Sequence, residues 1–505
     1  MPVVQPFRAA LLACALGTAA CATHAAPVDP TATAQSSDAV RRLQADLGTV
    51  FNAPVMARGV WGVDVRSLDT GQVLFRHNAE RLMMPASNMK ILTLAVAAET
   101  LGWDYRFTTL LESTAPVENG VLKGDLIVRG NGDPTISTRE NRRAAVFEYL
   151  ARELRGAGIT AIDGRIIGDD QAFEDEGIGP GWSWDYLEAG YAAPVGALQY
   201  NENTAELTIT AGAAVGDPAV LSVTPGSGFT LTNLVRTVDA GIRGNIRVQR
   251  RIDRPELEIS GTIGSDASPV RRTVAVLNPT LFFAQAMKDG LASRGIAVSG
   301  AAVDADDIAP ELLATLGQTR RVLATTDSPT LREIGTTLMK VSQNQFAETL
   351  LKAAGASRGM RGTTESGRMV AQELFSKWQV PQDSYVMADG SGLSRYNYIA
   401  PSTVTAVLQR MYADPRHREP FVATLPIAAR DGTISTRLRR TRAAENAVAK
   451  TGSIANVRSL SGFVKTQDGE MLVFSIIAND FPIPAATVTW IADLAVEHLA
   501  NFTRR

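Results

Sequence analysis

A serine and a lysine three residues apart give this 505-residue chain a pair of groups suited to nucleophilic catalysis. Ser87 and Lys90 form a Ser-x-x-Lys motif at the start of a predicted apolar helix, so the hydroxyl and the amine lie on one helical face within reach of each other. The free N–H groups and positive dipole end of a helix N-terminus suit an attacking oxygen and the oxyanion that it creates. An ordinary helix N-cap is the alternative interpretation of Ser87.

A Lys-Thr-Gly motif at Lys450, Thr451 and Gly452 comes just before a predicted strand. At a strand edge, glycine lets a substrate backbone approach closely because it has no Cβ atom. The lysine and the threonine can then hold a carboxylate. A surface turn between strands is the alternative interpretation.

A Ser-x-Asn motif lies between the other two, at Ser342 and Asn344, in a short gap between predicted helices. Alone, these residue types indicate only helix capping. In the order Ser-x-x-Lys, Ser-x-Asn, Lys-Thr-Gly, however, the motifs are the signature of serine acyl-transferases that recognise penicillin. The set therefore predicts chemistry through an acyl-serine.

The chain resembles the D-alanyl-D-alanine carboxypeptidase/endopeptidases, the class C low-molecular-mass penicillin-binding proteins, over nearly all of the sequence after residue 26. Three further segments carry the resemblance: 130–135 (GNGDPT), 389–395 (DGSGLSR) and 425–433 (LPIAARDGT). The long span between the first and second motifs also matches, because this family inserts extra domains there.

The resemblance implies a role for each motif residue. Ser87 would attack the carbonyl of the penultimate D-Ala, with Lys90 as general base, and water would hydrolyse the resulting ester. An amine with an ordinary pKa of about 10.4 is neutral at pH 7 only if it is desolvated or lies near another cation such as Lys450. Ser342 would relay the proton to the leaving nitrogen, and Asn344 would orient Lys90 and the substrate amide.

Substrate contacts are implied in the same way. Lys450, Thr451 and Gly452 would bind the terminal carboxylate, and the N–H groups of Ser87 and Ser453 would form the oxyanion hole.

In the resembling family, an Asp and a Phe of the insert face the diaminopimelate of the peptide stem, and Asp169 and Phe173 occupy a comparable place. A turn followed by a core aromatic is the alternative interpretation of these two residues. Arg395 could meet the same carboxylate. Relatives often carry a polar residue five positions after the motif lysine, whereas this chain has Ala455, which leaves its stem-peptide preference open.

The histidine and cysteine counts argue against other hydrolytic chemistries. Outside the first 26 residues the histidines are His77, His417 and His498, and none lies in a pattern typical of a Ser-His-Asp enzyme. Both cysteines, Cys14 and Cys21, lie within those 26 residues, and no His-Glu-x-x-His occurs, so we expect neither a metal nor another cofactor. A net charge of −2, with no P-loop or dinucleotide fingerprint, predicts no nucleic-acid partner.

Residues 1–26 have the features of a secretory signal peptide: Arg8, an apolar stretch, and a small-residue cleavage site ending at Ala26. We therefore expect export to the periplasm. Lipidation at Cys21 is the weaker alternative, because Thr18 stands where a lipobox carries a branched apolar residue. No later stretch has about 18 uninterrupted apolar residues, so we expect at most peripheral membrane contact. The sequence is compatible with a homodimer.

These motifs and the patterns between them predict an α/β (α+β) penicillin-binding, β-lactamase-like transpeptidase fold. We expect a catalytic domain over 27–108 and 270–505, interrupted by a β-rich insert over 109–269 with two nested subdomains. Apolar periodicity predicts helices over 40–51, 89–101, 280–294, 328–340, 345–354, 365–378, 401–411 and 485–502. Alternation predicts strands over 59–65, 71–76, 206–210, 229–232, 256–260, 459–464 and 471–478.

The expected function is a periplasmic serine DD-peptidase of peptidoglycan. It would remove terminal D-Ala from pentapeptide stems, cleave D-Ala–diaminopimelate cross-links and be acylated by β-lactam antibiotics as covalent inhibitors. A serine β-lactamase or esterase on the same scaffold is one alternative. Class A lactamases deacylate through a Glu-x-x-Leu-Asn loop, and no such sequence lies between Asn344 and Lys450. A non-catalytic wall-binding protein is the other, and three intact motifs argue against it.

Overall fold

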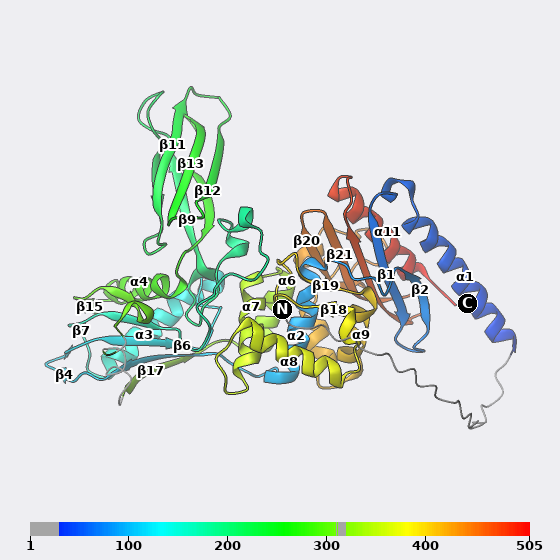
Figure 1. Ribbon diagram of the computed structural model, residues 1–505, viewed down its shortest axis with the longest axis horizontal. Coiled ribbons are helices and arrows are strands. Elements are labelled where there is room, and N and C mark those ends of the chain that lie inside the picture. The colour runs from blue at the N-terminus through cyan, green and yellow to red at the C-terminus, as the bar shows by residue number, and fades with distance from the viewer. Residues whose placement is uncertain (1–29, 310, 312–319, 505) are drawn as a thin grey trace, which may run out of the picture.

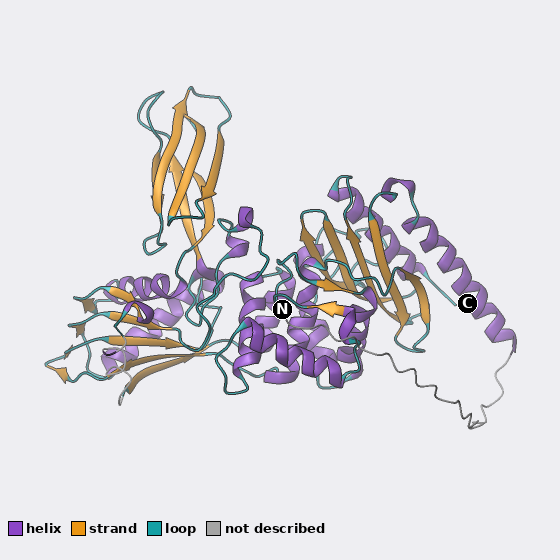
Figure 2. Ribbon diagram, in the orientation of Figure 1, coloured by secondary structure: helices purple, strands orange, loops and turns teal. Residues whose placement is uncertain are grey.

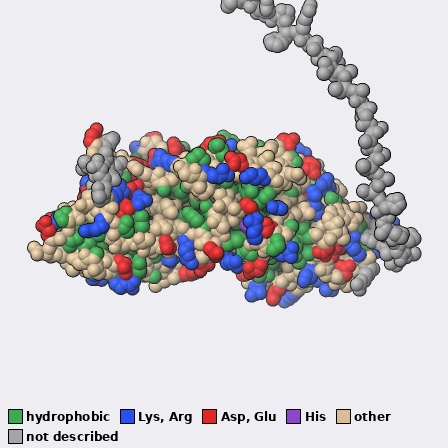
Figure 3. Space-filling view, turned by 90° about the horizontal axis from the view of Figure 1, so that it is seen from below, with side chains coloured by type: hydrophobic (Ala, Val, Ile, Leu, Met, Phe, Trp, Pro, Cys, Tyr) green, Lys and Arg blue, Asp and Glu red, His purple; other side chains and the backbone are tan. Residues whose placement is uncertain are grey.

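The computed structural model describes residues 30–309, 311 and 320–504; the predicted signal peptide and Cys21 lie outside them. The chain is elongated, with a sheet-and-helix body at one end, a helical cluster in the middle, and the inserted region at the other end (Figure 1). In the part of the chain that is described, no helix is both long and apolar enough to cross a membrane. Basic and acidic side chains are interspersed over the face in Figure 3, in keeping with the small net charge.

A five-stranded antiparallel sheet joins the two ends of the sequence, in the order β2-β1-β22-β21-β20. Helices α1 (Pro30–Phe51) and α11 (Ala485–Asn501) lie together on one face, where a core that includes Leu47, Leu460 and Val496 is buried (Figures 1 and 2). The strands are β1 (Val60–Ser67), β2 (Val73–His77), β20 (Val448–Ile454), β21 (Val457–Lys465) and β22 (Met471–Asn479).

The helical cluster surrounds α2 (Met89–Leu101), which is buried from Met89 through Ala98. A helix buried on all sides has no polar stripe, which is why α2 is apolar throughout. Its neighbours are α6 (Leu331–Lys340), α7 (Asn344–Ala356), α8 (Thr364–Lys377), α9 (Pro401–Ala413) and α10 (Arg418–Thr424). The predicted helices of this cluster are confirmed.

The inserted region contains helices as well as strands. We propose that it ends near Asp327 rather than at residue 269, because β17 (Arg321–Asp327) pairs with β3 (Thr108–Ser113) in the sheet β16-β8-β6-β3-β17. The other strands of that sheet are β6 (Leu126–Gly130), β8 (Ile166–Asp169) and β16 (Ala302–Asp304), and α3 (Arg142–Gly156) and α4 (Pro279–Ala292) accompany it.

A second part of the insert is built of strands alone and projects from the body in Figure 1. It holds two three-stranded sheets, β10-β9-β14 and β11-β13-β12. Their strands are β9 (Thr204–Thr210), β10 (Val220–Val223), β11 (Thr230–Val238), β12 (Asn245–Arg250), β13 (Glu256–Gly264) and β14 (Val270–Ala275). A small sheet in the order β15-β7-β5-β4 lies beside the first part: β4 (Val117–Glu118), β5 (Val121–Leu122), β7 (Ala161–Ile162), β15 (Ala297–Val298).

Candidate active site

Ser87 lies in a short 3-10 helix, Ala86–Asn88, that leads directly into α2. The Lys90 amine, Nζ, donates hydrogen bonds to Ser87 Oγ at 3.0 Å, to Asn344 Oδ1 at 2.6 Å and to the Ser391 carbonyl at 2.7 Å. Three acceptors from three parts of the chain therefore hold the amine beside the hydroxyl. The contact expected from the three-residue spacing is present.

Lys90 is completely buried. Burial penalises the charged ammonium and lowers the pKa of Lys90 to about 7, although the negative charges of Asp389 and Glu348 act in the opposite direction. At neutral pH a substantial fraction of this amine is therefore the free base, the form that can accept a proton from Ser87.

Lys450 forms a second buried cationic position. Its Nζ donates to Ser342 Oγ at 2.8 Å and to the Thr451 carbonyl at 2.7 Å. Burial, and then the positive charge of Lys90, hold the pKa of Lys450 well below its usual range. The two lysines therefore compete for positive charge, and a bound anion would stabilise that charge.

The third motif lies inside β20, the edge strand of the sheet, and not before a strand as expected. A Cβ atom on Gly452 would come within 2.2 Å of Ser459 Oγ, 2.7 Å of the Pro85 carbonyl and 3.0 Å of the Ser87 nitrogen. Glycine is needed here because the backbone of the nucleophile passes directly against the strand. The Ser459 hydroxyl fixes this approach by donating to the Pro85 carbonyl at 2.7 Å.

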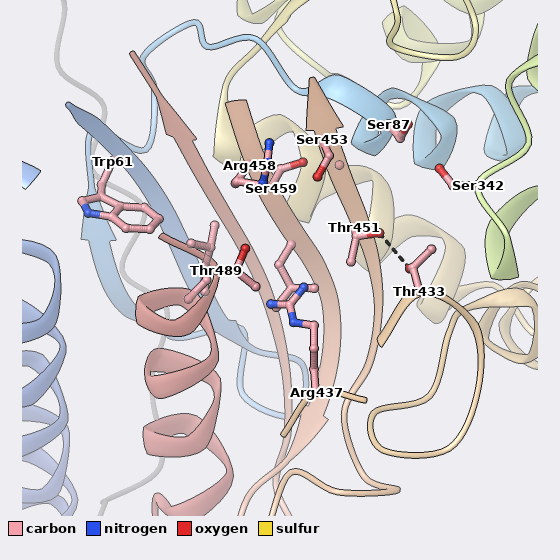
Figure 4. Close-up of a pocket in the computed structure, with 14 residues that line it drawn as sticks. Trp61, Ser87, Ser342, Thr433, Arg437, Thr451, Ser453, Arg458, Ser459 and Thr489 are labelled. Carbon is pink, nitrogen blue, oxygen red and sulfur yellow. Dashed lines mark hydrogen bonds between the residues drawn. The ribbon is translucent and has the colours of Figure 1, made fainter. Parts of the chain in front are cut away.

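Two adjoining clefts meet at Ser87, Ser342 and Ser453. One has a volume of about 410 Å³, and its lining includes Tyr186, Tyr191, Asn344, Leu393, Ile454 and Ala455. The other has a volume of about 360 Å³ and continues past Thr451; the lining includes Thr433, Arg437, Arg458 and Thr489 (Figure 4). We call them the tyrosine cleft and the arginine cleft. A substrate carbonyl at Ser87 would have room on both sides.

The insert holds the loop of the second motif. Ser342 has a left-handed backbone, φ 61°, and the next three side chains each bond to the insert. The Asn344 amide donates to the Tyr191 carbonyl at 2.7 Å. The other two bonds run from Gln343 Nε2 to Glu202 Oε2 and from Gln345 Nε2 to Gln199 Oε1, both at 2.5 Å. The insert therefore fixes a strained loop that carries two motif residues.

A pair of buried carboxyl groups behind Lys90 was not predicted as part of the site. Glu348 accepts the backbone N–H groups of Gly390 and Ser391 at 2.9 and 2.7 Å, which directs the Ser391 carbonyl toward Lys90. Burial, and then the charge of Asp389, raise the pKa of Glu348 to about 7. The sequence held one signal for Glu348: it comes four residues after Asn344, and residues four apart share a helix face, so both side chains point the same way.

Asp169 and Phe173 are not among the residues that line the two clefts, so the structure does not bring them to Ser87, and their contact with substrate stays a prediction. Asp169, on β8, is buried and accepts a hydrogen bond from Arg320 Nη1 at 2.7 Å. Phe173 is buried in the core, where a Cβ on Gly132 or Gly362 would lie within 2.7 or 2.5 Å of its ring. This burial favours the alternative interpretation of a turn and a core aromatic.

Replacing Phe173 with alanine should lower the free energy of unfolding by about 3–5 kcal/mol, because it empties a large buried site. Denaturant unfolding measures this loss. A variant with unchanged stability but a selective loss of activity on stem peptides would instead return Phe173 to the substrate site.

Arg395 does not line the tyrosine cleft itself but is bonded to a residue that does. Its Nη2 donates to the carbonyl of Ala455, one of the lining residues, at 3.3 Å. Sequence reasoning missed the two tyrosines of this cleft, Tyr186 and Tyr191, because they lie in irregular segments of the insert where no periodicity marks them.

Comparison with known proteins agrees with this geometry. The model of the D-Ala-D-Ala carboxypeptidase 3 (S13) family matches residues 43–497. The chain belongs to this family. It is 31% identical over 456 residues to a D-alanyl-D-alanine carboxypeptidase of an Actinomadura species, covering 88% of this chain and 82% of that one. It is 28% identical over 424 residues to the carboxypeptidase DacB of Haemophilus influenzae, covering 83% and 85% of the two chains.

The fold is also that of solved penicillin-binding proteins. The crystal structure of penicillin binding protein 4 from H. influenzae superposes with a TM-score of 0.77 at 26% identity, over 90% of this chain and 99% of that one. A structure of the same H. influenzae protein in complex with a β-lactam gives a TM-score of 0.73. The chain is thus a class C low-molecular-mass penicillin-binding protein and a serine-type D-Ala-D-Ala carboxypeptidase, as predicted, with the expected α/β penicillin-binding fold.

Proposed function

We propose that this S13-family peptidase acts on peptidoglycan stem peptides in the periplasm through an acyl-enzyme at Ser87. It removes terminal D-Ala and also cleaves D-Ala–diaminopimelate cross-links. The observation that carries the proposal is the 3.0 Å contact between the Ser87 hydroxyl and the buried amine of Lys90, whose pKa of about 7 makes it a base at neutral pH.

Acylation starts when neutral Lys90 accepts the Ser87 proton and Oγ attacks the carbonyl carbon of the penultimate D-Ala. The N–H groups of Ser87 and Ser453 stabilise the oxyanion. When the C–N bond breaks, Ser342 passes its proton to the leaving nitrogen and takes one in turn from Lys450, to which it is hydrogen-bonded. Water then hydrolyses the Ser87 ester and restores the enzyme. When water attacks the ester, a proton of that water returns to Lys450 through Ser342, and Lys90 returns its proton to Ser87 Oγ.

The terminal carboxylate binds at Lys450 and Thr451. The Thr451 and Thr433 hydroxyls share one hydrogen bond at 2.7 Å (Figure 4), so the pair has one proton left to donate to the carboxylate. A carboxylate there restores the charge on Lys450, and a charged Lys450 keeps Lys90 neutral by repulsion.

The tyrosine cleft receives the acyl side of the substrate. Desolvation, and then negative charges that include Asp185 and Glu188, raise the pKa of Tyr191, so acidic groups lie near this tyrosine. A diaminopimelate side chain ends in an ammonium and a carboxylate. The acidic side chains near Tyr191 can bind the ammonium. Arg395, which is bonded to Ala455, can bind the carboxylate.

Digestion of defined muropeptides tests the function. The purified protein should release D-Ala from a pentapeptide stem and convert a D-Ala–diaminopimelate cross-linked dimer to monomers, both followed by liquid chromatography with mass spectrometry. Ser87→Ala is the matched control and should do neither. A folded wild-type protein that leaves both substrates intact would contradict the proposal.

A further inference from the structure

The arginine cleft extends beyond the place proposed for the terminal carboxylate. It begins at Ser87 and Ser342, passes Thr433 and Thr451, and continues between β21 and α11 (Figure 4). Its volume of about 360 Å³ lies in the range of pockets that hold small-molecule ligands, roughly 300–1,000 Å³. A leaving group that is a single alanine ends at its own carboxylate, so it would leave the far part of this cleft empty.

The two arginines of the cleft differ in charge compensation. Arg437 forms a two-pronged ion pair with Asp493 of α11, with a shortest contact of 2.7 Å, so its charge is neutralised within the protein. Arg458 forms no ion pair within the described part of the chain. Its Nη1 donates to the carbonyls of Ile454 and Val457 at 3.0 and 2.7 Å, and Nε and Nη2 have no acceptor among the residues that the structure describes.

Arg458 lies where a ligand bound at the reacting centre can contact it. It faces Ser453 across the β20–β21 pair and lines both clefts. Partial burial lowers the pKa of Arg458, in keeping with the lack of an ion-pair partner among the described residues. None of the described residues that line the arginine cleft is acidic. A carboxylate of a ligand would supply the missing partner.

We propose that the arginine cleft binds the leaving peptide of a cross-linked substrate and that Arg458 binds a carboxylate of that peptide. The inference rests on the proposed function, in which Lys450 and Thr451 take the carboxylate next to the scissile bond. In a cross-link, the residue after that bond is diaminopimelate, whose side chain continues into a second stem with further carboxylates. A single leaving D-Ala has only the carboxylate assigned to Lys450 and Thr451, whereas this leaving group carries further carboxylates that can bind Arg458.

The test compares Arg458→Gln and Arg458→Lys with wild type in three reactions: D-Ala release from a pentapeptide, cleavage of a cross-linked dimer, and acylation by benzylpenicillin. Arg458→Gln should lower kcat/KM for the dimer about tenfold, the size of one lost charge-assisted hydrogen bond, and change the other two rates less than about threefold. Arg458→Lys should restore much of the dimer activity. Arg247→Gln, which removes an exposed cation from β12, is the control and should change nothing.

Two results would overturn the inference. If Arg458→Gln lowers all three rates together, the arginine acts by holding the turn at Ile454 and thereby the oxyanion site. If the dimer and the pentapeptide are both unaffected, no carboxylate reaches it. Failure of the proposed function itself would look different, since wild type would then neither be acylated nor cleave either peptide.

Discussion

Replacing Lys90 with methionine is expected to reduce the rate of acylation by β-lactams and by peptide substrates at least about 10³-fold. The amine is the group within hydrogen-bond distance of Ser87 Oγ that can accept its proton, and Asn344 and Ser391 hold it there. Methionine keeps the length of the side chain but has no basic atom. Stopped-flow acylation with a chromogenic β-lactam measures the loss.

The wild-type rate should depend on pH in a defined direction. Because the pKa of Lys90 is lowered to about 7, the free base increases as the pH rises through 7. Acylation should therefore accelerate across this range and level off above it, and the residual rate of Lys90→Met should lack the same rise. Lys377→Met, at an exposed position in α8, is the matched control, and thermal unfolding shows that both variants are folded. If Lys90→Met is acylated at the wild-type rate, the assignment of Lys90 as the general base is wrong.

Replacing Lys450 with methionine should weaken recognition of the terminal carboxylate. Lys450 is buried beside Ser342 and Thr451, so an ammonium there binds an anion in a poorly hydrated place. Losing one charge-assisted hydrogen bond of this kind costs about 1.5–3 kcal/mol, or roughly 10- to 150-fold in kcat/KM.

The matched comparison for Lys450→Met is a substrate pair that differs only in that carboxylate, such as a depsipeptide with a free acid and its methyl ester. The acid should lose much more kcat/KM than the ester. Equal losses would mean that Lys450 acts through Ser342 in proton transfer and not through the carboxylate.

The motif residues were predictable because their chemistry depends on local spacing and order. Ser87 and Lys90 are one helical turn apart, so their contact follows from helix geometry once α2 is recognised. The bond between Lys450 and Ser342 joins residues 108 positions apart, and no local pattern indicates it; the resemblance to a family implied only that both motifs belong to one site.

Local sequence patterns say least where the structure depends on pairing between distant parts of the chain. The pattern around Asp169 and Phe173 shows a strand end and an aromatic residue, but the partner of Asp169 is Arg320, 151 positions later. The boundary near Asp327 that we propose depends on the pairing of β17 with β3 across more than two hundred residues, which no local pattern indicates. Helix α3 was missed because its arginine-rich sequence lies among short strands.

Intact-mass spectrometry of the protein with benzylpenicillin, followed by peptide mapping, tests the central claim most directly. The account predicts a single, long-lived adduct on Ser87, absent from Ser87→Ala and from Lys90→Met on the same timescale. If the folded protein forms no adduct, the result contradicts acyl-serine chemistry and favours a non-catalytic wall-binding protein. An adduct that disappears within seconds would contradict the peptidase assignment in favour of a β-lactamase.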